Sequence, residues 1–566
     1  MRLHISLGTL LVAGSTLPAA CGDNGPSQPH LSPAQGTGGS QNGRAGKGGG
    51  GTLSGAAGGD GGSSSGAAGD GAGGESGRSG TGGRGGSSTT GAAGQLLGGD
   101  IGADGGAPGA GGTGGQGGNG DLHRLYVGPG GYDAGPGTRS QPFATLAQAA
   151  SVAVSGDTIV FLDGNFALPK LKAPIVVPDG VDIVADNQRE VSLVASGGTL
   201  LELAGNTRID GINFDGFDTV VHAVASDGAV SVTNSSFLNC AGTGTSALEV
   251  GGSASVALVG GSSQNWGNCA AFGHAYGQGT LSVDGGLVHF TTTDTVTVFT
   301  ADDTATLQLS NLIATDGNRP VLLLNDSSEA TVEQSTLSTL GSTVITLNAS
   351  ASLEVTNSDL SIAAGASSVG ACIASNLDGS GSIALARSIV HDCSAGVRGT
   401  APAVLSVTGT DIYAMSENGL DFPGGQGGVI DITDSSLRDI GSLAARLGGS
   451  GAGAQIFQVT VRGTTIASVP YGFALSGAAS STWDLGTLAA AGENVLTATT
   501  TSLQVLTAAG TFVAAVGNTW APGVQSADGS GQYAAVGAGA VLEVTDGAGQ
   551  NYSDDNGATL RLAENP

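Results

Sequence analysis

One short pattern recurs between Val230 and Ile466, and it constrains the fold of this chain more than any other feature. Each copy has an apolar residue, one variable residue, two small polar residues, another variable residue and a second apolar residue. Successive copies lie 22 to 30 residues apart, a period that indicates stacked structural units. The clear copies are Val232–Phe237, Val332–Leu337, Val355–Leu360, Val407–Ile412, Ile432–Leu437 and Val461–Ile466, and looser copies begin at Leu258, Val283, Leu309 and Leu385.

The residue types within each repeat indicate strands. Runs such as Ala229–Val232 and Ala247–Val250 alternate at period two and are bounded by Gly, Ser, Asn and Asp. Three short strands per repeat predict an all-β fold, a right-handed parallel β-helix solenoid of about 12–15 coils, with apolar residues stacked inside. A β-sandwich of short strands would not require a fixed period.

The small polar positions predict the corner of each coil. Two residues after the first apolar position stand Asn234, Asn311, Asn357 and Asp434, with glycine in several other copies. These residue types tolerate left-handed backbone angles, and stacked amides bond to one another. We therefore expect a left-handed corner with a ladder of amide side chains.

The composition suits thin stacked coils and argues against nucleic acid as a partner. Of 566 residues, 104 are glycine and only 4% are aromatic. The 46 acidic and 18 basic residues give a formal net charge of −28. Lysine occurs only at Lys47, Lys170 and Lys172. We expect the protein to be a monomer.

Residues 1–20 have the charged start, short apolar centre and small-residue exit of a signal peptide. The segment ends in Leu17-Pro18-Ala19-Ala20-Cys21 and resembles a bacterial lipoprotein signal, which implies lipidation of Cys21. This resemblance predicts an exported protein, lipid-anchored at the cell surface or outer membrane. Pro18 stands where the lipoprotein pattern prefers a leucine-like residue, so plain secretion is the alternative.

The remaining chain divides by composition. Residues 21–121 are rich in Gly, Ser and Ala and predict a disordered tether, because they cannot bury enough apolar surface to fold. We expect an N-terminal cap and first coil over 122–166 and regular parallel β-helix coils over 167–477. Irregular final coils and a C-terminal cap are expected over 478–566.

The expected N-terminal cap contains an amphipathic helix that begins after Pro142 and covers the open end of the first coil. Its apolar face is predicted to consist of Phe143, Leu146, Ala147, Ala150 and Val154.

The same segment is similar to the N-terminal signature of pectate-lyase-like β-helix proteins, including polysaccharide lyase family nine. The matching elements are Tyr126-Val127, Gly131-Tyr132-Asp133, Pro136-Gly137-Thr138, Pro142-Phe143-Ala144-Thr145 and Gly156-Asp157-Thr158-Ile159. The resemblance implies the fold more than a reaction.

The catalytic residues of β-helix enzymes have only weak matches in this sequence. A polygalacturonase-like hydrolase is disfavoured, because His274 precedes the Asp302-Asp303 pair and no Arg-x-Lys exists. A lyase needs a Lys or Arg base, and no lysine follows Lys172. The candidates that remain are Arg319 with Asp316, and Arg387, for which local pairing with carboxylates is the alternative role.

Two acidic stretches are candidates for calcium, which is the only cofactor that the sequence leaves open. They are Asp210, Asp215 and Asp218, and the pair Asp302 and Asp303. Neither spacing matches a calcium loop. Solvated charges that discourage sheet association are the alternative explanation.

Aromatic residues gather in one stretch of this aromatic-poor chain. Trp266, Phe272, His274 and Tyr276 predict a glycan-binding patch, and a second candidate runs from Tyr413 to Phe422. Aromatic residues that cover a corner of the solenoid are the alternative.

We therefore expect a non-enzymatic, lipid-anchored surface protein for adhesion or glycan binding, with a membrane and a polysaccharide or surface glycan as partners. The alternative is an enzyme, most readily a polysaccharide lyase and otherwise a glycoside hydrolase, acting on uronic-acid polysaccharide.

Four cysteines lie in the repeats, in a chain expected to reach an oxidising compartment. Cys240 and Cys269 are 29 residues apart and Cys372 and Cys393 are 21 apart, about one coil in each case. Because stacked coils lie about 4.8 Å apart, within the reach of a disulfide, we expect these two pairs.

Overall fold

The computed structural model describes residues 123–562 except 225–227, 243, 265–268, 290–296, 342, 365–368, 425–426, 449–455, 479, 488, 506–511, 521–532, 536–540, 545–551 and 554–558. The predicted signal peptide, Cys21 and the tether therefore lie outside the described residues. Within them the chain forms one helix, α1 (Leu146–Val152), and strands β1 to β47. That helix is too short to cross a membrane, and the described part of the chain holds no other candidate.

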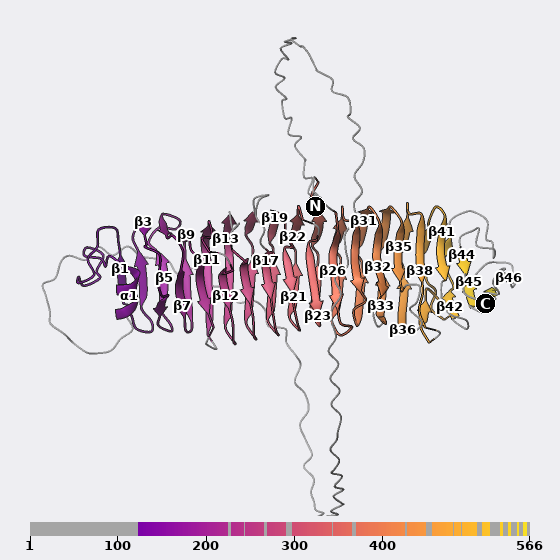
Figure 1. Cartoon of the computed structure of the whole chain (residues 1–566), viewed down its shortest axis with the longest axis horizontal. Coiled ribbons are helices and arrows are strands. Elements are labelled where there is room, and N and C mark those ends of the chain that lie inside the picture. The colour runs from indigo at the N-terminus through magenta and orange to yellow at the C-terminus, as the bar shows by residue number, and fades with distance from the viewer. Residues whose placement is uncertain are drawn as a thin grey trace, which may run out of the picture. The chain divides into compact units, whose positions relative to one another are not determined.

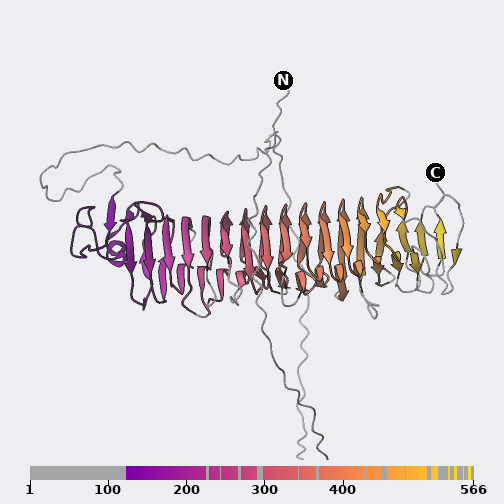
Figure 2. The same cartoon turned by 90° about the horizontal axis from the view of Figure 1, so that it is seen from above.

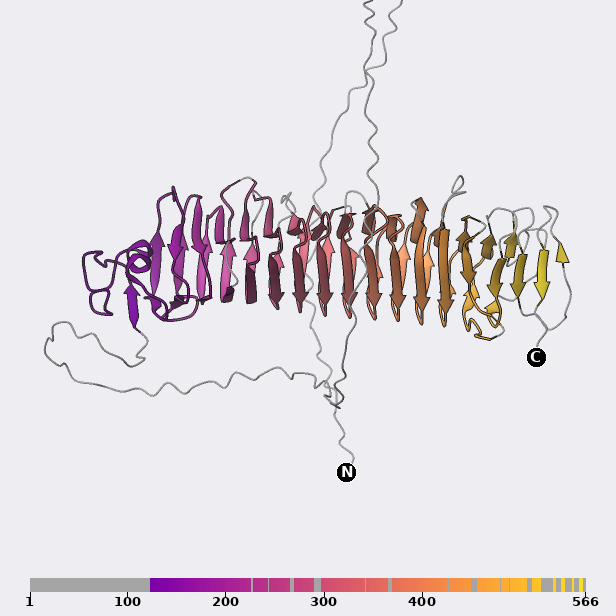
Figure 3. The same cartoon turned by 90° about the horizontal axis from the view of Figure 1, so that it is seen from below.

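The strands form a parallel β-solenoid with three ladders, each of which receives strands from successive coils (Figure 1). Ladders 1 and 2 belong to a 32-stranded sheet, and ladder 3 is a separate 15-stranded sheet. Figures 2 and 3 show the strands of successive coils side by side in chain order. The predicted parallel β-helix is confirmed.

Ladder 1 contains β1 (Arg124–Val127), β2 (Thr158–Phe161), β5 (Asp182–Ala185), β8 (Thr207–Asp210), β11 (Ala229–Leu238), β13 (Ser255–Gln264), β15 (Thr280–Asp284), β18 (Thr306–Ser310), β21 (Glu329–Glu333), β24 (Ser352–Thr356), β27 (Ser382–Ala386), β30 (Val404–Thr408), β33 (Gly427–Thr433), β36 (Ile456–Arg462), β39 (Thr482–Asp484), β42 (Phe512–Ala515), β45 (Val541–Val544) and β47 (Thr559–Leu562).

Ladder 2 shares the long strands β11 and β13 and adds β3 (Gly164–Ala167), β6 (Val191–Val194), β9 (Ile212–Asp215), β16 (Leu287–His289), β19 (Ile313–Gly317), β22 (Thr336–Thr339), β25 (Asp359–Ile362), β28 (Ile389–His391), β31 (Asp411–Met415), β34 (Ser436–Ile440), β37 (Thr465–Ala467), β40 (Val495–Thr497) and β43 (Thr519–Trp520).

Ladder 3 contains β4 (Ile175–Val177), β7 (Thr199–Leu203), β10 (Thr219–Ala223), β12 (Ser246–Val250), β14 (Ala271–Ala275), β17 (Thr297–Ala301), β20 (Leu322–Leu324), β23 (Ile345–Ala349), β26 (Ala371–Leu377), β29 (Ala395–Thr400), β32 (Asn418–Gly424), β35 (Leu443–Leu447), β38 (Tyr471–Leu475), β41 (Thr501–Val505) and β44 (Tyr533–Ala535).

The first apolar position of the repeat forms one buried column in ladder 1. Strand register joins Val232 to Leu258, Val332 to Val355, and Ile432 to Val461. These side chains are 4% exposed or less, so each coil buries its repeat residue against the same residue of the next coil. The predicted alignment of the repeat is confirmed.

The corner between ladders 1 and 2 has the predicted left-handed backbone. Asn234, Asn311, Asn357 and Asp434 have φ between 50° and 52°. An amide ladder does not form among them: Asn234 and Asn311 donate to Asp210 and Asp284 of the preceding coil. That prediction is wrong because Asn234 and Asn311 lie within reach of a carboxylate on the preceding coil, and Asn357 accepts from Arg387 on the next coil.

The second small polar residue of the repeat forms a buried ladder that explains its presence. Ser358 Oγ accepts the backbone N–H of Ser335 at 3.1 Å and donates to the Thr356 carbonyl at 2.8 Å. Ser388, Thr410 and Ser435 extend the ladder and are at most 4% exposed. Each hydroxyl thus satisfies buried backbone groups at a sharp corner.

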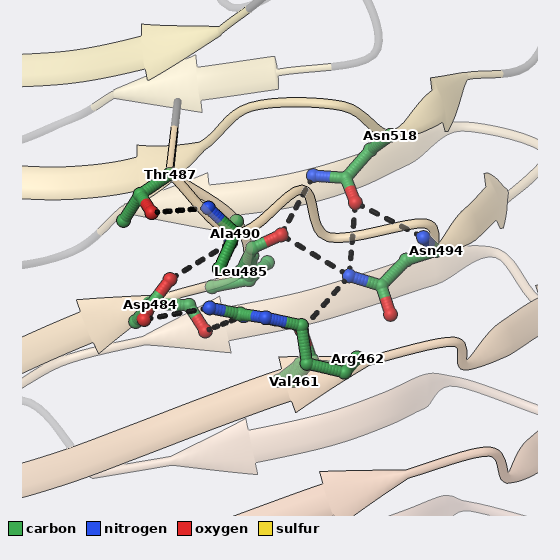
Figure 4. Close-up of polar contacts among 9 residues, drawn as sticks. Val461, Arg462, Asp484, Leu485, Thr487, Ala490, Asn494 and Asn518 are labelled. Atoms are coloured by element: carbon green, nitrogen blue, oxygen red, sulfur yellow. Dashed lines mark hydrogen bonds and ion pairs between the residues drawn. The ribbon is translucent and has the colours of Figure 1, made fainter.

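Later coils replace the hydroxyl by an amide (Figure 4). The Asn494 amide nitrogen donates to the carbonyls of Val461 and Leu485 at 3.1 and 3.2 Å and to the Asn518 side-chain oxygen at 2.9 Å. The longer amide reaches across the wider loop between Leu485 and Asn494, which is how the corner tolerates an insertion.

Helix α1 is shorter than predicted and has a different buried face. Thr145 caps it by accepting from the Gln148 N–H at 3.2 Å. Leu146, Ala149 and Ala150 are buried, and the helix packs against β1 and β4, the first strands of their ladders.

Two residues of the predicted helix face are exposed. Ala147 faces solvent and Val154 is 64% exposed. The predicted face assumes a helix that begins at Phe143. The helix begins three residues later, at Leu146, and ends before Val154. Phe143 is also buried, but it belongs to the extended segment before the helix.

The coils continue past residue 478, where Trp483 of β39 pairs with Val513 of β42. Trp483 fills their interior and lies 5.7 Å from the ring of Phe457. At the end of the described residues β46 (Tyr552–Ser553) pairs antiparallel with β47. This reversal leaves less open strand edge than a further parallel strand would.

Candidate functional site

Two members of the predicted glycan patch lie together on the outer side of ladder 3. His274 is the outward residue of β14 and Tyr276 follows that strand, with their ring centroids 5.2 Å apart. Trp266 lies outside the described residues. Ladder 3 therefore presents an imidazole and a phenol side by side.

Phe272 is a core residue, so its predicted role in glycan binding is wrong. The ring is 1% exposed and makes edge contacts with Phe237 and Phe299 at 5.4 and 5.9 Å. The pairing of β12 with β14 keeps one register across Phe272, and the aligned residues Ala247 of β12 and Val298 of β17 are buried as well. These strands thus bury two consecutive residues at this point, and Phe272 is the first of the two in its coil.

A chain of hydrogen bonds extends from His274 through successive coils. His274 Nε2 lies 2.7 Å from Asp302 Oδ2, and Asp302 Oδ1 accepts from the Asn325 amide at 2.6 Å. Asn348 donates to Asn325 at 2.7 Å, and Asn376 donates to Asn348 at 3.0 Å. We call these five residues the polar ladder. Amide stacking thus occurs beside ladder 3, not at the corner where it was predicted.

Glu249 and His222 complete the group around Tyr276. Strand register aligns His222, Glu249 and His274 on β10, β12 and β14. Burial, and then the charge of Glu249, raise the pKa of the Tyr276 hydroxyl, so the phenol stays protonated and able to donate. We call His222, Glu249, His274, Tyr276 and Asp302 the ladder-3 cluster.

The sequence contained one usable sign of the missed members. Glu249 and His274 are 25 residues apart, the period of the repeat, so both occupy the same outward position on neighbouring coils. The period that aligns ladder 1 therefore also aligns these outward residues of ladder 3.

The predicted calcium residues are bonded to protein donors. Asp210 pairs with Arg208 at 2.6 Å, Asp215 accepts from Asn239 at 2.8 Å, and Asp218 accepts from the Gly198 N–H at 2.7 Å.

Asp302 and Asp303, the second acidic pair, have different hydrogen-bond partners. Asp302 belongs to the polar ladder, whereas Asp303 accepts from the Gly277 N–H at 3.0 Å. Over the described ranges no group of three or more His, Cys, Asp or Glu side chains is placed to hold a metal ion. Calcium binding stays a prediction.

The candidate catalytic arginines lie at different corners. Arg319 is exposed between ladders 2 and 3, whereas Arg387 lies between ladders 1 and 2 and donates to Asn357 Oδ1 at 3.0 Å. Asp316 is part of β19, and its side chain is outside the described atoms. The structure does not join these residues into one site.

The second aromatic candidate is already occupied by protein groups. Tyr413 stacks on His391 with ring centroids 5.1 Å apart, and the Arg438 guanidinium lies 4.3 Å from the Tyr413 ring centroid. Phe422 is fully buried. With these neighbours on its ring, Tyr413 is not an open stacking platform.

The cysteines in the repeats form the two expected pairs. Cys240 is joined to Cys269 and Cys372 to Cys393, with Cα–Cα distances of 5.8 and 5.6 Å. Cys240, Cys269 and Cys393 lie between ladders 2 and 3, and Cys372 is near the start of β26 in ladder 3, so each disulfide ties one coil to the next.

Comparisons with known proteins give the chain a family match over part of its length. A family model described as "Protein of unknown function (DUF1565)" matches residues 129–242. No curated protein matches the chain.

Solved structures resemble the chain distantly. Pectate lyase Pel9A is 13% identical, with 63% of this chain and 78% of that chain covered and a TM-score of 0.29. The catalytic domain of a GH87 α-1,3-glucanase is 12% identical over 62% and 70%, with a TM-score of 0.29. The A-module of Azotobacter vinelandii mannuronan C-5 epimerase AlgE6 is 11% identical over 70% and 93%, with a TM-score of 0.22. The lipoprotein signal and the family-nine signature stay predictions.

Proposed function

We propose that this protein is a non-catalytic, cell-surface glycan-binding protein whose solenoid presents the outer side of ladder 3 to polysaccharide. The observation that carries the proposal is the ladder-3 cluster and its continuation into the polar ladder. Rings and hydrogen-bonding groups are adjacent there, as recognition of sugar rings and hydroxyls requires.

The polar ladder has bonding capacity beyond its internal contacts. The amide of Asn348 donates one hydrogen to Asn325 and accepts one bond from Asn376. A second amide hydrogen and a second carbonyl lone pair remain on such a side chain. Because successive members are about 4.8 Å apart, an extended polymer along the solenoid axis meets equivalent groups on consecutive coils.

The anchoring part of the proposal rests on the sequence before the described residues. Cys21 would carry the lipid, and residues 21–121 would hold the solenoid away from the membrane as a flexible tether. This arrangement makes the outer face of ladder 3 accessible to extracellular polymers.

One observation supports the alternative of a polysaccharide lyase. His274 is bonded to Asp302 and lies beside the protonated Tyr276, so potential base and acid groups are adjacent. The reaction would produce an unsaturated uronate that absorbs in the ultraviolet.

The test uses the full chain and a panel of neutral, uronic-acid and sulfated polysaccharides. Replacing Tyr276 by alanine removes the half-buried ring that would contact a sugar and is expected to weaken binding about three- to tenfold. The control is Tyr132→Ala, which removes a 71% exposed tyrosine between β1 and α1, outside ladder 3. Absence of binding to every glycan, or equal losses in both variants, contradicts the proposal. Accumulation of ultraviolet-absorbing product establishes the lyase instead.

A further inference from the structure

The outer column of ladder 3 changes its chemistry toward the C-terminus. Strand register places Arg398, Asp421 and Arg446 at equivalent positions on β29, β32 and β35. The same column contains His274 on β14, and the residues between His274 and Arg398 are uncharged. One continuous column therefore joins the ladder-3 cluster to a pair of arginines.

Asp421 holds both arginines. Its side chain is 2% exposed, and its two oxygens accept from Arg398 Nε at 3.0 Å and from Arg446 Nε at 2.6 Å. A buried carboxylate bonded on both sides fixes the orientation of the two guanidinium groups.

The two guanidinium groups differ in how many of their nitrogens have a partner among the described residues. Arg398 also pairs with Glu417 and donates to Ser394 Oγ at 3.4 Å, so its other nitrogens are engaged. Arg446 is 40% exposed, and its Nη1 and Nη2 have no partner among the residues that the structure describes. Arg446 thus presents an oriented pair of N–H donors to solvent.

The surroundings of Arg446 suit an incoming anion. Beyond Arg446 the column continues with Ala474, which is buried, and Gln504, so no carboxylate competes from that side. The chain has a net charge of −28, so it attracts a polyanion only where a cation such as the Arg446 guanidinium is exposed. A guanidinium fork matches the paired oxygens of a carboxylate or sulfate.

We propose that Arg446 docks an oxyanion group, a carboxylate or a sulfate ester, of a polysaccharide that lies along ladder 3. This inference rests on the proposed function and specifies its ligand as an acidic polymer. The column from His274 to Arg446 crosses eight strands of the 15-stranded sheet, or about 34 Å at about 4.8 Å per strand. A long polymer reaches both ends at once, whereas a short oligosaccharide reaches one, so long chains bind more tightly.

The experiment measures the affinity of the full chain for polygalacturonate, which carries only carboxylates, for dextran sulfate, which carries only sulfate esters, and for neutral dextran. Arg446→Gln is expected to weaken binding of the acidic polymer about 10- to 100-fold, as loss of a charge-assisted bidentate contact implies. The affinity for neutral dextran should stay unchanged. Arg446→Lys should give an intermediate loss of affinity for the acidic polymer, because lysine keeps the positive charge but lacks the paired N–H donors of the guanidinium group.

Arg438→Gln is the matched control. Arg438 is also 40% exposed, but its nitrogens are occupied by Asp411 and Asp439, so its loss should leave acidic-polymer affinity unchanged. The acidic polymer that shows the larger loss in Arg446→Gln identifies the docked group as carboxylate or sulfate.

The outcomes separate the two proposals. If Tyr276→Ala loses affinity for a glycan while Arg446→Gln keeps full affinity for acidic polymers, glycan binding stands and the docking role of Arg446 is wrong. If no glycan binds the unmodified chain, both proposals are overturned. Equal losses in Arg446→Gln and Arg438→Gln would show a general charge effect and also overturn the docking role.

Discussion

Replacing Phe272 by alanine should destabilise the middle coils without removing a ligand contact. The ring is 1% exposed and lies between Phe237 and Phe299, which belong to ladders 2 and 3. Truncating a buried Phe costs about 3–5 kcal/mol, through lost burial and the cavity that remains.

The upper part of that range is expected at this site. The adjacent Gly273 position is so tightly packed that an added Cβ would lie 2.5 Å from Leu281 Cδ2, so the surroundings have little room to rearrange. Collapse of the cavity would require movement of neighbouring coils, which strand hydrogen bonds oppose.

Hydrogen exchange is the suitable assay, because coils of a solenoid can open separately from the rest. A loss of about 3–5 kcal/mol accelerates exchange about 150- to 5,000-fold for amides that require these coils to open. The protected amides of β11, β14 and β17 should show this, and those of β33 and β36 should not.

Tyr276→Ala is the control, because this side chain is half-buried on the outer side of the same coil. Its exchange rates should stay within about tenfold of the unmodified protein, since less apolar area is lost. Similar acceleration in the two variants, or less than tenfold acceleration in Phe272→Ala, would refute the assignment of Phe272 to the core.

Further predictions concern the disulfides, the anchor and the buried hydroxyl ladder. Peptide mapping under non-reducing conditions should find Cys240 with Cys269 and Cys372 with Cys393, and removing one pair should cost about 3 kcal/mol of stability; a Cys240–Cys393 link would contradict the coil register. Cys21→Ser should shift the folded protein from membranes to the soluble fraction, and equal fractionation of both forms would contradict lipidation. Ser358→Ala should destabilise by about 1–3 kcal/mol, because it leaves the buried Ser335 N–H without its acceptor; the outward Ser361→Ala is the control, and equal thermal stability of the two variants would contradict a structural role for the ladder.

The column of apolar residues was predictable because stacking imposes the same requirement on every coil. Val232, Val355 and Ile432 fill the same interior position, so the requirement is visible as a period in the sequence. The left-handed corner was predictable for the same reason, because Asn, Asp and Gly share the backbone freedom that it needs.

Two features depend on local backbone geometry and were not predictable. Phe272 has the strand parity of His274, but ladder-3 strands bury two consecutive residues at this point, as Val220 with Val221 also shows. The start of α1 depends on Thr145, whose capping bond shifts the buried face away from Ala147. In both cases the alternation of positions along the strand or helix does not by itself reveal which side chains face inward.

The candidate site was only partly predictable because its members come from different coils. His274 and Tyr276 attract notice as rings within one short segment, but Asp302, Asn325 and Asn348 join them only through coil stacking. Arg446 is likewise an ordinary surface arginine until register places it beside the buried Asp421.

The most direct test of the account is the binding of long polysaccharides to the full chain, compared between the unmodified protein and a Tyr276→Ala/Arg446→Gln double variant. The account predicts binding of an acidic polymer that the double variant loses by more than either single variant, with the fold unchanged in circular dichroism. Binding that the double variant keeps in full, or no binding by the unmodified protein, would contradict a glycan-binding role for ladder 3.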